Sequence, residues 1–171
     1  FYMGSEPSGY ATQEYDVTEY VNYGGDNLIC VRADASLEEE WFYEGAGIYR
    51  DVWLEKTAAV SVAPFGTFVY AELRSPYTSA TIYIETEVNN HSSKVQDCQV
   101  EQRILDAEGH EVGKTISVMM DALRPRETRG CKQQLTLSDP HLWSTTDPYL
   151  YKVETLIRVN GQVTDCYQTT I

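Results

Sequence analysis

Residues 45–54 read Gly-Ala-Gly-Ile-Tyr-Arg-Asp-Val-Trp-Leu, and the interpretation of the whole chain starts from this stretch. The small residues at 45–47 allow the backbone to pass close to another element. Residues 48–54 then alternate, which predicts a strand with Arg50 among aliphatic residues on its apolar face. Because an unpaired charge is costly there, Arg50 is expected to be partly withdrawn from water by a partner on an internal carboxylate or across an interface. If the partner lies across an interface that is missing from this chain, Arg50 should be exposed here.

Outward from this stretch, the chain is predicted to be all-β. No segment of about 11 residues or more carries a 3.6-residue period. Short strands are expected at 12–17 and 27–33. Beyond residue 57, turn pairs such as Asn89-Asn90 and Asn160-Gly161 separate alternating strands at the spacing of an antiparallel sandwich. The strands expected there cover residues 58–63, 66–73, 79–89, 95–105, 112–118, 128–137, 149–159 and 163–171.

A change in composition near residue 57 predicts two domains. Eleven of the 20 aromatic residues lie before it, together with a net charge of −9 out of the total of −13. Residues 57–171 have the length of an immunoglobulin-like antiparallel β-sandwich. Residues 1–56 are too few for a complete jelly-roll β-sandwich, so we expect them to be the C-terminal part of one.

Composition also excludes several classes of partner. A net charge of −13 without a stripe of basic residues argues against nucleic acid. No apolar run of about 18 residues is present, which argues against a membrane span. No signal peptide opens the chain, which slightly favours a cytoplasmic location, although Phe1 is not a natural start.

The cysteines and histidines are too widely scattered to suggest a metal site. Four cysteines allow three fully paired connectivities, but buried free thiols fit their positions in apolar, alternating segments better. The cysteines are Cys30, Cys98, Cys131 and Cys166.

Three motifs, in order, carry a family resemblance. Residues 15–32 contain Tyr-Asp-Val-Thr-Glu-Tyr and then Gly-Asp-Asn-Leu-Ile-Cys-Val-Arg; residues 45–54 follow; residues 141–151 contain His-Leu-Trp-Ser and then Asp-Pro-Tyr-Leu-Tyr. Together they resemble the family-two glycoside hydrolases, which include β-galactosidases, β-glucuronidases and β-mannosidases. Taken locally, Leu142 and Trp143 are expected to plug one end of the sandwich.

The resemblance implies a non-catalytic accessory region of a longer parent enzyme that cleaves β-glycosidic bonds, of the β-galactosidase type. The region would support and space a catalytic barrel of the same parent chain, and the parent could be a homo-oligomer. Retaining glycosidases need two carboxylates about 5 Å apart. The Glu residues here show no such pairing, so no catalytic residue is assigned and the chain alone is predicted to be inactive.

The resemblance also suggests where substrate would approach. In the family, the loop before the second motif nears the barrel mouth, and some members use an acid there to bind sodium and sugar. Here Trp41 holds that place, with Glu39 and Glu40 nearby, so no metal or cofactor is assigned to this chain, whereas the parent could use Na⁺ or Mg²⁺. Trp41, Tyr43 and Arg50 are the candidate residues for substrate approach or a domain interface.

Aromatic faces stack on sugar rings, and the resemblance implies a β-galactoside or a related sugar as the ligand class. A second hypothesis stays open, in which the chain is a free-standing carbohydrate-binding or adhesion β-sandwich module.

Overall fold

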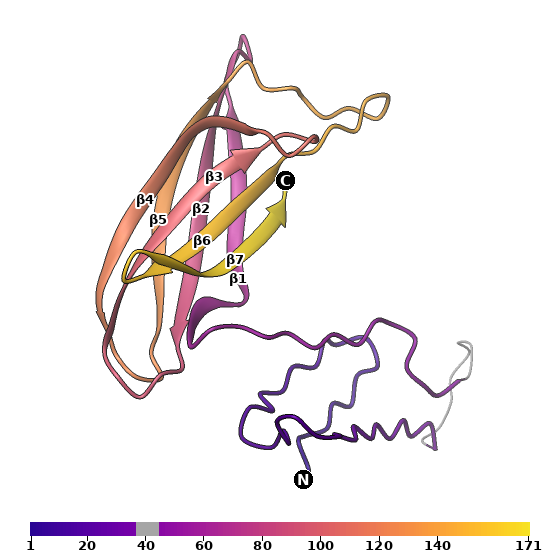
Figure 1. Cartoon of the computed structure of the whole chain (residues 1–171). Helices are drawn as coiled ribbons and strands as arrows, with labels where there is room; N and C mark the ends of the chain where they lie inside the picture. The colour runs from indigo at the N-terminus through magenta and orange to yellow at the C-terminus, as the bar shows by residue number, and fades with distance from the viewer. Residues whose placement is uncertain (37–44) are drawn as a thin grey trace. The chain divides into compact units, whose positions relative to one another are not determined.

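The structure, a computed structural model, describes residues 1–36 and 45–171 (Figure 1). It divides into two compact units, residues 1–53 and 54–171. Among the described residues, strands occur only in the second unit, and no helix is long and apolar enough to cross a membrane. The strands are β1 (Val60–Leu73), β2 (Ser79–Asn90), β3 (Gln96–Leu105), β4 (Glu111–Leu123), β5 (Thr128–Ser138), β6 (Lys152–Val159) and β7 (Gln162–Thr170).

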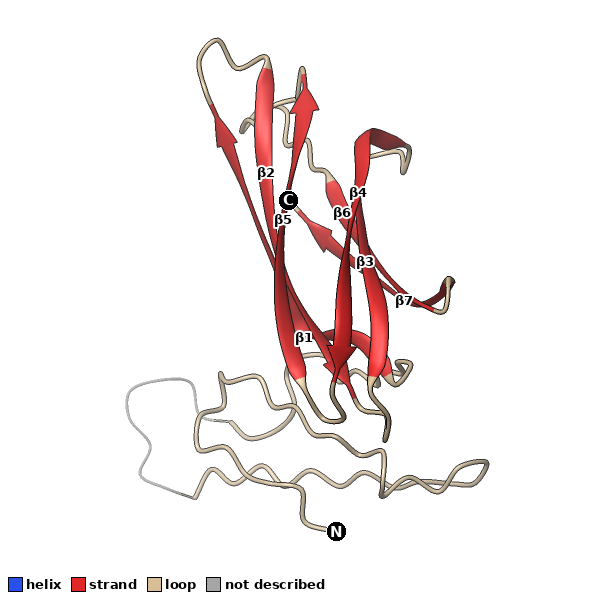
Figure 2. Ribbon diagram, turned by 90° about the vertical axis from the view of Figure 1, so that its left-hand side faces the viewer, coloured by secondary structure: helices blue, strands red, loops and turns tan. Residues whose placement is uncertain are grey.

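The second unit is the predicted antiparallel β-sandwich of the immunoglobulin-like kind. One sheet has the order β1-β2-β5 and the other has the order β4-β3-β6-β7, with every neighbouring pair antiparallel. Figure 2 shows the two sheets as separate layers. The β6–β7 hairpin turns at Asn160 and Gly161, which both have positive φ, as the tight-turn pattern predicted.

Several expected strand boundaries are wrong. The strand expected at 112–118 continues to Leu123 in β4, and the one expected at 149–159 begins only at Lys152 in β6. The strands expected at 58–63 and 66–73 are one strand, β1, because a bulge between Val62 and Thr67 changes the register with β2 without ending the pairing. The turn expected at Asn89-Asn90 also does not form, since both residues pair with β1 inside β2. Asn90 is instead buried inside the sandwich.

The strands expected at 12–17, 27–33 and 48–54 do not form. The described residues before Val60 contain no strand, and Leu28 and Val52 are 88% and 68% exposed. Alternation states which side chains would share a face of a sheet, but a strand also needs a neighbour to accept its backbone hydrogen bonds. The described residues of the first unit supply no such paired neighbour.

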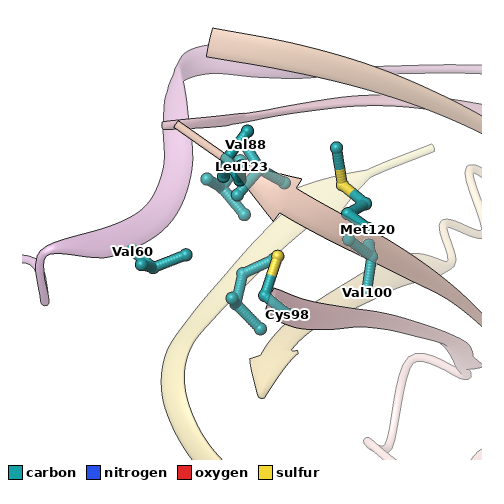
Figure 3. Packing of buried hydrophobic residues seen from close by; sticks show 8 residues of the cluster. Val60, Val88, Cys98, Val100, Met120 and Leu123 are labelled. Carbon is teal, nitrogen blue, oxygen red and sulfur yellow. The ribbon is translucent and has the colours of Figure 1, made fainter. Parts of the chain in front are cut away.

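The core of the sandwich consists of two apolar clusters. Strand β2 contributes Ala80, Ile82, Ile84 and Val88, all buried as their alternation predicted. The first cluster, drawn in Figure 3, contains Val60, Val62, Val88, Cys98, Val100, Met120, Leu123 and Ile157. The second contains Ala80, Ile82, Ile84, Ile104, Leu135, Leu137 and Val153.

A polar layer separates the two clusters. On β3, Gln102 lies between Val100 of the first cluster and Ile104 of the second, and the inward positions of β2, β5 and β6 change cluster at the same level. We call this layer the polar belt. Its members are Thr86, Gln102, Gln133 and Thr155.

Gln102 is the centre of the polar belt and is fully buried, with 0% exposure. Its Nε2 donates to Thr86 Oγ1 at 2.8 Å and lies 3.5 Å from Thr155 Oγ1. Its Oε1 accepts from Nε2 of the half-buried Gln133 at 2.9 Å. The belt therefore joins strands of both sheets through one buried amide whose oxygen and nitrogen both have partners.

The buried Asn90 joins two loops at one end of the sandwich. Its Nδ2 donates to the carbonyl oxygens of Lys94 and Leu123 at 2.8 and 2.9 Å, and its Oδ1 accepts from the backbone and hydroxyl of Ser92. Its own backbone bonds to Glu127 and Arg126 in the β4–β5 turn. The side chain is buried because it satisfies backbone groups that would otherwise lack partners.

We predict that Gln102→Leu lowers the free energy of unfolding by about 2 kcal/mol, because it leaves Thr86 and Gln133 without their buried partner. Adding Gln133→Leu should cost less than the sum of the two single changes, since no stranded amide then remains at that position. Urea unfolding followed by circular dichroism of the four variants of this cycle tests both statements. A neutral Gln102→Leu would contradict the assigned role of the belt.

Candidate functional site

Two of the three candidate site residues lie where the structure gives no description. Trp41 and Tyr43, with the nearby Glu39 and Glu40, belong to residues 37–44, which are outside the described residues. Their proposed approach to a sugar therefore stays a prediction.

Arg50 is described and is not withdrawn from water, which is the outcome expected of this chain if the partner of Arg50 lies across an interface with another part of a longer parent protein. The residue is exposed, its Nη1 lies 3.5 Å from the carbonyl oxygen of Tyr10, and its guanidinium carbon lies 5.2 Å from the ring centre of Tyr49. Tyr49 in turn donates to the carbonyl oxygen of Gly9 at 2.9 Å. Because the predicted strand does not form, no apolar face encloses Arg50, and an arginine in water needs no carboxylate partner.

The position of Arg50 distinguishes the two partners considered for it. Among the described residues, Arg50 makes no ion pair. An internal buried pair is therefore absent from the part of the chain that the structure describes. A partner across an interface with another part of a longer protein remains a prediction.

Acidic side chains on the outer face of the β4-β3-β6-β7 sheet are held in ion pairs. Glu154 accepts from Arg103 Nε at 2.6 Å and from Gln168 Nε2 at 2.9 Å, and Glu101 accepts two bonds from Arg158. Burial opposes ionisation of Glu154, but the bonds from Gln168 and Arg103 outweigh it and lower the pKa of this carboxyl below its usual value. These carboxylates are engaged in holding the sheet together, and the lowered pKa of Glu154 is the opposite of what a general acid needs.

The four cysteines are free thiols. Cys98 is buried and Cys131 is half-buried, as expected, but Cys30 and Cys166 are exposed, which corrects the prediction for these two. Burial, and then the neighbouring Cys98, raise the pKa of Cys131 to about 11. A thiol with that pKa stays protonated near neutral pH and is a poor nucleophile. No group of three or more His, Cys, Asp or Glu among the described residues could hold a metal ion.

The connection from β5 to β6, residues 139–151, is an ordered loop, which we call the 139–151 loop. The ring of His141 stacks on Tyr149 at 4.1 Å, and its Nε2 lies 2.6 Å from Asp147 Oδ2. The backbone nitrogen of His141 donates to the hydroxyl of Tyr151 at 2.8 Å. Ser144 and Asp147 exchange two backbone hydrogen bonds at 2.9 and 3.2 Å. The loop is therefore held by its own polar and aromatic side chains.

The loop does not plug the sandwich. Leu142 is 42% exposed and Trp143 is 58% exposed, so the prediction that this pair closes one end of the core is wrong. The half-buried Tyr149 and Tyr151 lie against the body instead: the hydroxyl of Tyr149 accepts from the backbone of Ala107, and Tyr151 packs against the second apolar cluster. The aromatic residues that follow Pro148 do the packing that the sequence pattern assigned to Trp143.

The part of the chain that matches a known protein family coincides with the sandwich. The family model described as "Glycosyl hydrolases family 2" matches residues 61–171. The chain belongs to glycosyl hydrolase family 2. The match begins one residue after β1 starts and runs to the last residue, so it spans the whole immunoglobulin-like sandwich of this family 2 chain.

Individual relatives extend the likeness to the first unit. The chain is 35% identical over 170 residues to the β-galactosidase BoGH2A of Bacteroides ovatus, covering 99% of this chain and 20% of that protein. It is 27% identical over 198 residues to a β-glucuronidase of Formosa agariphila, covering 99% and 19%. A solved family 2 member from Bacteroides cellulosilyticus superposes with a TM-score of 0.88 at 29% identity, covering 99% of this chain and 23% of that chain.

The coverages state how large a part of its relatives this family 2 chain matches. It spans about a fifth of the length of the curated relatives that it matches, while almost all of its own residues align. The chain therefore corresponds to a region of family 2 glycoside hydrolases rather than to a whole enzyme of their length.

We predict that Arg50→Ala changes the free energy of unfolding of this chain by less than about 0.5 kcal/mol, since an exposed guanidinium loses little. Arg103→Ala is the matched control and should cost about 2 kcal/mol, because it strands the buried Glu154. Urea unfolding of the three proteins tests the pair. A loss above about 2 kcal/mol for Arg50→Ala would rule out the interface interpretation.

Proposed function

We propose that this chain is the non-catalytic accessory region of a β-glycosidase of the β-galactosidase type, in which the sandwich supports and spaces a catalytic barrel of the same parent chain. The observation that carries the proposal is the match to BoGH2A, which uses 99% of this chain but only 20% of that β-galactosidase. Most of the length of such an enzyme lies outside the matched region, and its barrel belongs to that remainder.

The chemistry of the described residues supports this role. Cleavage with retention needs two carboxylates about 5 Å apart, one of them protonated for the first step. The buried Glu154 is instead ionised and paired with Arg103, and Glu101 is paired with Arg158. Carboxylates held in ion pairs on the outer face of a sheet do not form the acid and nucleophile pair that hydrolysis needs, which fits a non-catalytic role.

The proposal also assigns a role to the first unit. Residues 1–56 are the C-terminal part of a jelly-roll domain whose other strands belong to the parent enzyme. The apolar side chains of Leu28, Ile29 and Trp53, which are 88%, 71% and 79% exposed, support this, because part of a domain without its remaining residues leaves apolar side chains in water. Trp41, Tyr43 and Arg50 would then lie near the sugar or at a domain interface of the parent.

The proposal predicts no hydrolysis by the 171-residue chain alone. Nitrophenyl β-galactosides, β-glucuronides and β-mannosides should react at the buffer rate, whereas the parent enzyme should cleave the β-galactoside at least about 10⁶-fold faster than the uncatalysed reaction. Both proteins should be produced in a host without its own β-galactosidase. Turnover by the chain itself, or a parent without activity on any of the three substrates, would contradict the proposal.

The same sample tests the free-standing module as an alternative. Calorimetric titration of the 171-residue chain with galactose and lactose should give no saturable binding in the millimolar range. Saturable binding together with a parent that lacks a barrel would favour the carbohydrate-binding module.

A further inference from the structure

We infer that Leu142 and Trp143 form a docking surface for the polypeptide that follows residue 171 in the parent enzyme. The inference rests on the proposed function, because it needs a parent chain that continues past this residue. It adds to the proposed function the residues of this sandwich that hold the following domain.

The 139–151 loop holds these two apolar side chains in the solvent. The bonds His141–Tyr151, His141–Asp147 and Ser144–Asp147 fix the backbone on both sides of Leu142 and Trp143. The two side chains nevertheless remain 42% and 58% exposed. An adjacent Leu-Trp pair on a loop that its own contacts hold in place is the kind of apolar patch that marks a protein interface.

Residue 171 lies next to the base of this loop. Ile171 and Tyr151 exchange two backbone hydrogen bonds, each 2.9 Å long, so the last residue is anchored at the base of the loop. The hydroxyl of the same Tyr151 accepts from the backbone nitrogen of His141, the residue before Leu142. In Figure 1 the C-terminus lies beside the point at which the 139–151 loop joins β6. Polypeptide that continues past Ile171 therefore starts beside this loop.

The loop suits a polypeptide better than a sugar as the occupant. A sugar site needs free donors and acceptors beside the aromatic ring, in addition to the ring itself. Four polar side chains of this loop are already engaged within it: His141 with Asp147, and Ser144 with Asp147 and Thr146. The neighbour of Trp143 on its other side is the aliphatic Leu142, which suits an apolar protein surface.

Hydroxyl-radical footprinting read by mass spectrometry tests the inference, because it measures the solvent exposure of individual side chains. The oxidation rates of Trp143 and Leu142 are compared between the 171-residue chain and the intact parent enzyme. The rate for Trp143 should fall about fivefold in the parent, as expected for a side chain that becomes part of an interface core. Phe65 is the internal reference, since it is 75% exposed. It lies in the β1 bulge opposite residues 86–88 of β2, whereas the loop begins after Ser138, which pairs with Ser79 at the other end of β2.

A pair of matched variants makes the test independent of the comparison between two proteins. In the parent, Trp143→Asp should raise the oxidation rate of Leu142 to its value in the 171-residue chain. Thr145→Asp places the same charge on another exposed residue of the loop and should leave the rate for Leu142 unchanged.

Three outcomes would overturn the inference. They are an equal rate for Trp143 in both proteins, equal protection of Phe65 and Trp143, and protection that appears in the 171-residue chain as its concentration rises, which would assign the surface to a second copy. The hydrolysis assay on the same parent sample separates the two proposals. A parent that cleaves β-galactosides with Trp143 still exposed refutes the docking surface alone, whereas an inactive parent refutes the proposed function.

Discussion

The sandwich depends on the buried hydrogen bonds of Gln102. An amide with no access to water must be satisfied by the protein, and here Thr86 on β2, Gln133 on β5 and Thr155 on β6 surround it. Apolar side chains tolerate small displacements of one sheet over the other, but these directional bonds form in one alignment only. The polar belt therefore sets how the two sheets face each other. That alignment in turn fixes where the β5–β6 connection begins and ends.

The two ends of the sandwich use polar groups differently. At one end, the buried Asn90 joins the β2–β3 loop to the β4–β5 turn and leaves that end closed. At the other, His141 and Asp147 stiffen a loop that carries Leu142 and Trp143 in water. In the proposed parent enzyme the sandwich faces other domains. At the end that carries the 139–151 loop, Leu142 and Trp143 are exposed apolar side chains available for such a contact.

Sequence reasoning predicted the sandwich well because each strand there has a neighbour within the chain. The alternation of apolar and polar residues then predicts both the strand and which of its faces is buried, as at Ile82 and Ile84. It failed for residues 48–54, where the same pattern has no paired neighbour and Arg50 is exposed. It also missed Gln102, although a glutamine between Val100 and Ile104 at inward positions of a strand is a readable signal. Asn90 and Trp143 were misassigned because residue type alone does not state which partners are near.

Native-state hydrogen exchange of the 171-residue chain tests the central claim, that the belt holds together a sandwich stable without the rest of the enzyme. The backbone amides of Gln102, Thr86 and Thr155 should exchange only through global unfolding, with the same free energy as urea unfolding gives. The amides of residues 1–36, which lie in no strand, should exchange at least about 10³-fold faster. Exchange at Gln102 as fast as in residues 1–36, or a free energy of opening well below the global value, would contradict the account.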